Sequence, residues 1–175
     1  MNKPTVQIYR GIPRSGKSTL IHREIVRSVN AGKRPSSSVV FSADDFWINI
    51  KTEAYEFDPK RIGEAHAWCF REFLNTLETL GGYSGDYVPD YLFIDNTSIR
   101  AYEIAPYIQA ANAYGLKHEI VTVLCDPAMA TSRNIHGVPA HVIWDMHRRL
   151  LTEELPPFWV QKVILNNLQP ILNAP

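Results

Sequence analysis

The chain has few cysteines, no excess of either charge and no long apolar run. Its two cysteines in 175 residues, Cys69 and Cys125, lie far apart and without metal-ligand spacing around them. This argues against a disulfide framework and against a cysteine-rich zinc site. Lysine plus arginine (18) equals aspartate plus glutamate (18), so no overall positive field would collect nucleic acid without specificity. No apolar stretch approaches the roughly 20 residues that a membrane helix requires, and we expect no contact with a membrane.

The remaining composition is that of an ordinary globular protein. Hydrophobic residues make up 45% of the chain and charged residues 21%, and this length suits one domain over residues 1–175 with a buried core. The first strand pattern follows directly after residues 1–4, which leaves no room for a signal peptide. Together with cysteines that we expect to be reduced and buried, this predicts a cytoplasmic protein, or one in the host cytoplasm if a phage encodes it.

One motif carries most of the functional information: residues 11–18 read G-x-x-x-x-G-K-S directly after an apolar segment. Its glycines let successive backbone N–H groups curl around the phosphates of a nucleotide. Lys17 would reach the β- and γ-phosphates, and the Ser18 hydroxyl would bind Mg²⁺. We therefore expect ATP and Mg²⁺, with the nucleotide held by Gly11, Pro13, Arg14, Ser15, Gly16, Lys17, Ser18 and Thr19.

Strand and helix patterns alternate along the whole chain, which predicts an α/β fold with a parallel five-stranded sheet and helices on both faces. Strands are expected over residues 3–10, 38–42, 91–94, 118–124 and 158–165. Helices are expected over 17–30, from Asp58 to Gly81, from a Ser98 cap to Gly115, and from Pro139 to before Pro156. A short helical lid is expected between the fourth strand and the last helix, and Asn166–Pro175 is expected to be a surface tail.

Acidic residues follow three of these strands. Asp44 and Asp45 follow the second, Asp95 the third and Asp126 the fourth, and ligands of parallel sheets bind beyond the carboxyl ends of the strands. Asp95 either binds Mg²⁺ or caps the next helix. Asp44 or Asp45 either takes the proton of an attacking hydroxyl or caps a helix that begins at Phe46.

Several basic residues are candidates with weaker support. Arg133 lies in a polar segment that could cover the triphosphate and stabilise the transferring phosphoryl group, or it is an ordinary surface arginine. His136 would touch substrate only if that cover closes, and His66 is expected in packing or solvent. The basic residues near the phosphate loop form either a local groove for nucleic acid or solvated helix faces: Arg14, Arg23, Arg27, Lys33 and Arg34.

The combined pattern resembles the P-loop polynucleotide 5′-hydroxyl kinases. The matching segments are G-I-P-R-S-G-K-S-T at 11–19, S-A-D-D-F at 42–46, F-D-P at 57–59, A-H-A-W-C at 65–69, F-I-D-N-T at 93–97 and R-N-I-H-G-V-P at 133–139. The resemblance implies that Asp44 is the general base, that Lys17 and Ser18 bind triphosphate and Mg²⁺, and that Arg133 is the lid arginine. It departs at Trp47, where such kinases often carry an arginine that binds the acceptor's phosphate. Trp47 either stacks on a base or belongs to the core.

Three functions follow as hypotheses. The first is ATP-dependent phosphorylation of a nucleic-acid hydroxyl, at a 5′ end or, as in related phage-type kinases, on a hydroxymethylated base. The second is a kinase of a small molecule such as a nucleoside, sugar or antibiotic, which the zero net charge favours. The third is a nucleotide-binding module without catalysis. The acceptor would contact Asp45, Trp47 and His136 in the first two.

Overall fold

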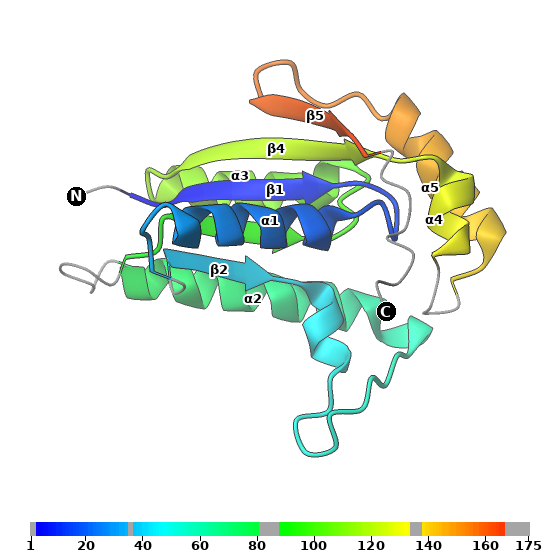
Figure 1. Ribbon diagram of the computed structural model, residues 1–175, viewed down its shortest axis with the longest axis horizontal. Helices are drawn as coiled ribbons and strands as arrows, with labels where there is room; N and C mark the ends of the chain where they lie inside the picture. The colour runs from blue at the N-terminus through cyan, green and yellow to red at the C-terminus, as the bar shows by residue number, and fades with distance from the viewer. Residues whose placement is uncertain (1–2, 35–36, 81–87, 134–137, 167–175) are drawn as a thin grey trace.

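All five strands of the sheet run parallel, in the order β2-β3-β1-β4-β5 (Figure 1). The computed structural model describes residues 3–34, 37–80, 88–133 and 138–166. Its strands are β1 (Thr5–Arg10), β2 (Ser38–Phe41), β3 (Tyr91–Asp95), β4 (Lys117–Leu124) and β5 (Gln161–Leu165). Its α-helices are α1 (Lys17–Asn30), α2 (Ile62–Leu80), α3 (Ala101–Ala113), α4 (Pro127–Ser132) and α5 (Ala140–Thr152), with 3₁₀ helices η2 (Ala43–Trp47) and η3 (Pro59–Arg61). The predicted fold class is confirmed.

Helices cover both faces of the sheet because the central strands are apolar on both sides. Val6 and Ile8 of β1 pack with Phe73 of α2 and Ile104 of α3 on one face. On the other face, α1 brings Ile21 against Tyr9, Phe93, Val121 and Val123. A parallel strand that is buried on both faces is a near-continuous run of apolar residues. For this reason the sequence predicts where the strands lie.

Local signals explain where the helices begin. Asp58 accepts a hydrogen bond from the Lys60 N–H at 2.9 Å and precedes Pro59, so the predicted cap and first-turn proline open η3, which leads into α2. Asp126 caps α4 in the same way, through the Ala128 N–H at 2.8 Å. Asp126 therefore serves as a helix cap, and it does not line the cavity beyond the strands.

Two boundary predictions are wrong for reasons that lie outside local sequence. Ser98 does not cap α3: it is buried before the helix at φ 44°. The helix begins after Arg100, whose N–H is bound by Glu103 at 2.7 Å, while Glu153 binds the next N–H at 2.8 Å. Asn166 is also buried rather than part of a surface tail, and the residues beyond it lie outside the described chain.

Both cysteines are free and buried, as expected. Within the described residues, no helix combines the length and apolar character needed to cross a bilayer.

A further buried apolar cluster, apart from those on the two faces of the sheet, joins the loop after β1 to α4 and α5, through Ile12, Ala130 and Ile143. These two helices therefore stand beyond the carboxyl ends of the strands, next to the phosphate-loop motif (Figure 1).

Two arginines tie α5 to the rest of the fold. Arg10, buried at the end of β1, donates to the Ile99 carbonyl at 2.9 Å and to the Leu150 carbonyl at 3.2 Å. Arg100 forms an ion pair of 2.7 Å with Glu153 just after α5. The backbone N–H of Ala101 and the Arg100 guanidinium lower the pKa of Glu153 below its usual value.

Replacement of Glu153 should therefore destabilise the protein in a pH-dependent manner. A depressed folded-state pKa stabilises the fold above the unfolded value, and this stability is lost as the pH falls through the folded pKa. We expect Glu153→Gln to lower the free energy of unfolding by up to about 1 kcal/mol at pH 7, with the difference shrinking in acid. Urea unfolding across pH 3 to 7 measures this, with exposed Glu154→Gln as control; a pH-independent difference would contradict the assignment.

Candidate functional site

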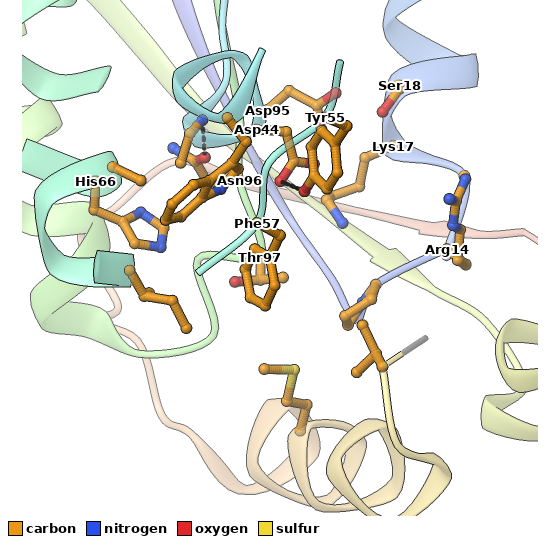
Figure 2. A pocket seen from close by; sticks show the side chains of 18 of the residues that line it. Arg14, Lys17, Ser18, Asp44, Tyr55, Phe57, His66, Asp95, Asn96 and Thr97 are labelled. Atoms are coloured by element: carbon orange, nitrogen blue, oxygen red, sulfur yellow. Dashed lines mark hydrogen bonds between the residues drawn. The ribbon is translucent and has the colours of Figure 1, made fainter. Parts of the chain in front are cut away.

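A cavity of about 520 Å³ opens at the carboxyl ends of β1, β2 and β3 (Figure 2). Its walls come from the phosphate loop, η2, the start of α2 and the segments after β3 and α4. The residues that line it include Pro13, Arg14, Gly16, Lys17, Ser18, Thr19, Asp44, Trp47, Tyr55, Phe57, His66, Asp95, Asn96, Thr97 and Arg133. Three strand-end motifs predicted to converge are thus in one cavity.

The phosphate loop is held closed by its own lysine. The Lys17 ammonium donates to the carbonyls of Gly11 and Ile12, both at 3.1 Å. The Gly11 N–H donates to the Thr97 carbonyl at 2.8 Å, which joins the loop to the end of β3. Burial lowers the pKa of Lys17, while the charges of Asp95 and Asp44 act in the opposite direction. Those two carboxylates favour the charged ammonium that an anionic phosphate requires.

Gly16 and Asn166 support the loop from behind. Gly16 has φ 93°, and a Cβ there would overlap the Asn166 side-chain amide. That amide donates to the Ser15 carbonyl at 2.6 Å, and the Asn166 backbone N–H donates to Leu124 at 2.8 Å. No sequence signal points to Asn166, because its role depends on β5 returning beside β4.

Asp95 and Ser18 form an oxygen-donor pair suited to Mg²⁺. Burial raises the pKa of Asp95, and the Lys17 ammonium and a hydrogen bond from Ser18 oppose that rise. No described group of three or more histidine, cysteine or acidic side chains could hold a metal. Mg²⁺ commonly takes one or two protein oxygens and completes its shell with water and phosphate, so this pair fits it. The alternative role of Asp95 as a helix cap is wrong, since α3 begins elsewhere.

Asp44 reaches the cavity because η2 is anchored to the end of β3. The Ala43 N–H donates to Asn96 Oδ1 at 2.9 Å, and the Ser42 hydroxyl donates to the Asp95 carbonyl at 3.2 Å. Ser42 also caps η2 by accepting from the Asp44 N–H at 3.2 Å, so the predicted cap role of the aspartates is wrong. Figure 2 shows Asp44 beside Tyr55, with Asp95 and Lys17 close by.

The neighbouring candidates take different positions. Asp45 is exposed and lines a separate hollow beside Trp68 and Glu72, so it does not face the phosphate loop. Trp47 is 4% exposed and packs in the core, although one part of it borders the cavity. The expected contact of Asp45 with substrate stays a prediction, although Asp45 lines a different hollow from Asp44. Trp47 has little exposed surface with which to contact a ligand.

Of the two lid candidates, the structure describes only Arg133. Arg133 follows α4 directly, is half-buried and lines the cavity, whereas His136 lies outside the described residues. α4 extends over the first part of the segment that the sequence predicts to be a lid. His66 also borders the cavity, which its helical pattern did not predict.

The basic residues after the phosphate loop do not gather at the cavity. α1 has 14 residues and is about 20 Å long, so residues after it lie at the far end of the sheet. Lys33 pairs there with Asp90 at 3.1 Å, and Arg27 pairs with Glu24 at 2.8 Å. Among these cations, Arg14 lines the cavity, which favours solvated surface charges over a local basic groove.

Tyr55 and Phe57 line the cavity without having been predicted as site residues. The Tyr55 hydroxyl donates to Asp44 Oδ1 at 3.4 Å, and both rings are partly exposed. The only sequence signal was the matching F-D-P segment at 57–59. Their place beside Asp44 depends on a turn that brings residues 55–57 back to η2.

Sequence comparison finds a relative that is similar to most of this chain. No protein-family model matches the chain. NEDD4-binding protein 2 from Homo sapiens is 32% identical over 148 residues, which cover 79% of this chain and 7% of that protein. The chain thus spans a small part of this relative's length.

Several solved structures share the fold of this chain. Mycobacterium tuberculosis APS kinase CysC with AMPPNP and APS is 13% identical with a TM-score of 0.58, over 93% of this chain and 90% of that chain. AvrRxo1-ORF1:-ORF2 with ATP is 21% identical with a TM-score of 0.60, over 85% and 47%. A chain of the Pnkp1/Rnl/Hen1 complex is 15% identical with a TM-score of 0.56, over 93% and 47%. The chain has the fold of ATP-binding P-loop kinases.

Removal of Asn96 should loosen η2. Asn96→Ala leaves the buried Ala43 N–H without its partner and should cost about 1–3 kcal/mol of unfolding free energy. Asn112→Ala, on the exposed side of α3, should change it by less than about 0.5 kcal/mol. Chemical denaturation of both variants tests this, and equal losses would show that Asn96 does not anchor η2.

Proposed function

We propose that this chain is an ATP-dependent kinase that transfers the γ-phosphoryl group to a hydroxyl of a nucleic acid, with a 5′-hydroxyl end as acceptor. The observation that carries this proposal is the meeting of Lys17, Asp95 and Asp44 in one cavity, from three different strand ends. A plain nucleotide-binding module requires the first two groups and has no use for Asp44, a second carboxylate in the same cavity. The polynucleotide acceptor is supported by the ordered motifs shared with the 5′-hydroxyl kinases.

Each residue has a distinct task in this proposal. The amides of the phosphate loop and Lys17 bind the β- and γ-phosphates of ATP and position them. Ser18 and Asp95 would hold Mg²⁺, which neutralises phosphate charge when bound. Arg133, which also lines the cavity, would stabilise the phosphoryl oxygens as charge develops.

Asp44 would act on the acceptor. Its carboxylate accepts the proton of the acceptor hydroxyl while that oxygen forms a bond to the γ-phosphorus. The bond between the γ-phosphorus and the β–γ bridging oxygen breaks, and ADP leaves. Tyr55 and the anchors of η2 hold the carboxylate in place for this step.

A second candidate acceptor is favoured by Trp47. The arginine that polynucleotide kinases often carry at this position is replaced by a buried indole, so the cavity lacks the guanidinium that would bind an acceptor phosphate there. A hydroxymethylated base in DNA, or a small molecule such as a nucleoside, sugar or antibiotic, would not need an arginine at this position to bind a phosphate. The fold that the chain shares with an APS kinase is compatible with a small acceptor.

Substitution of Asp44 and of Lys17 separates catalysis from nucleotide binding. Asp44→Asn should keep ATP binding and lose phosphoryl transfer by about 10²-fold or more, because the amide cannot accept the proton. Lys17→Ala should lose nucleotide binding or turnover. Transfer of labelled γ-phosphate and equilibrium ATP binding measure the two effects. Asp45→Asn is the matched control, since its side chain lines another hollow; full activity of Asp44→Asn would remove the assigned base.

Salt dependence separates the acceptors. The labelled transfer is measured on 5′-hydroxyl DNA and RNA oligonucleotides, modified-base DNA, nucleosides and sugars, at 50 to 200 mM salt. A polyanionic acceptor releases counterions on binding, so its apparent affinity should fall steeply with salt. A neutral small acceptor should show a flat response. Transfer to a sugar alone, with a flat response, would reject the nucleic-acid proposal.

A further inference from the structure

Aromatic side chains form the wall of the cavity next to Asp44. Tyr55 is 40% exposed and Phe57 is 51% exposed, and both line the cavity. Exposed rings inside a cavity leave apolar area in water, and a ligand with an apolar face would cover that area favourably. We call Tyr55 and Phe57 the aromatic wall.

Backbone hydrogen bonds fix the aromatic wall to the element that carries Asp44. The Glu56 N–H donates to the Trp47 carbonyl at 2.8 Å, and Ile48 pairs with Tyr55 in an antiparallel bridge. The buried Trp47 ring supports Phe57 from behind, with ring centroids 5.1 Å apart at 69°. Because these contacts join the wall to η2, its distance from the carboxylate is set before any ligand arrives.

Tyr55 connects the wall to the carboxylate itself. Its hydroxyl donates to Asp44 Oδ1 at 3.4 Å, as the dashed line in Figure 2 shows. Burial and the Asp44 charge raise the pKa of Tyr55 to about 12, so the phenol keeps its proton at neutral pH and remains a donor. A molecule that presents a hydroxyl to Asp44 therefore has its next few atoms beside the two rings.

We propose that Tyr55 and Phe57 bind the nucleobase of the nucleotide that carries the acceptor hydroxyl, an inference that rests on the proposed function. A nucleoside joins a flat ring to a hydroxyl through one sugar, and the wall lies next to Asp44, with the Tyr55 hydroxyl 3.4 Å from its Oδ1. Stacking on aromatic side chains accepts any base, because every base has a π-face. Because Trp47 is buried, Tyr55 and Phe57 rather than Trp47 have the exposed ring area on which a base could stack.

The test compares two oligonucleotides that differ only in the 5′-terminal nucleotide, which either carries its base or is abasic. Stacking is worth about 1–3 kcal/mol per base, so the protein should prefer the base-bearing oligonucleotide by about 5- to 150-fold in kcat/KM. Phe57→Leu and Tyr55→Leu should each bring this ratio toward one. Tyr55→Phe keeps the ring and should keep the preference.

Ile50→Ala is the matched control, since Ile50 is 96% exposed on the same projecting segment and does not line the cavity; it should keep the wild-type ratio. Thermal unfolding and ATP binding confirm that each variant is folded. Equal use of both oligonucleotides by the wild type, or an unchanged ratio in both leucine variants, overturns the nucleobase site alone. Absence of labelling on every oligonucleotide, with ATP binding intact, overturns the proposed function and the nucleobase site with it.

Discussion

The parallel pairing of β1 with β3 is the constraint on which the site depends. The register places Tyr9 opposite Asp95, so the phosphate loop and the Asp95 carboxylate emerge at the same edge of the sheet. The Gly11 N–H then bonds to the Thr97 carbonyl at 2.8 Å and closes the connection between the two strand ends. A shift of one residue in this register would send every side chain of β3 to the opposite face and separate Asp95 from Ser18.

The site also depends on the attachment of η2 to the carboxyl end of β3. Asn96 and the backbone of Asp95 hold Ala43 and Ser42, so the element that bears Asp44 is fixed by the same strand end that bears Asp95. Burial and charge then oppose each other: burial disfavours the charged forms of Lys17 and Asp95, and each charge favours the charged form of the other. Charge pairs of this kind at a strand edge prepare a cavity for a highly anionic ligand.

Three elements show which features the local sequence predicts and which it does not. α1 was predicted to its end residues because the phosphate-loop glycine and the Asn30–Gly32 break mark both ends locally. α3 was misplaced at its start, because the groups that bind its first N–H donors are Glu103 and the distant Glu153 rather than Ser98. The residues alone left open which of Asp44 and Asp45 acts as the base, and only the family resemblance pointed to Asp44. In the structure, Asp44 lines the cavity and Asp45 lines a separate hollow.

The sequence by itself determined the fold class, the phosphate loop and the strand-end carboxylates, since these follow from apolar periodicity and from short-range spacing. Only the tertiary structure showed that Asp44 lines the cavity while Asp45 lines another hollow, that Asn166 supports the loop, and that Tyr55 and Phe57 form a wall beside Asp44. These contacts join residues from separate elements, up to 151 positions apart in the case of Asn166 and Ser15. Their geometry is set by packing and hydrogen bonding across the fold, which no local pattern of residues encodes.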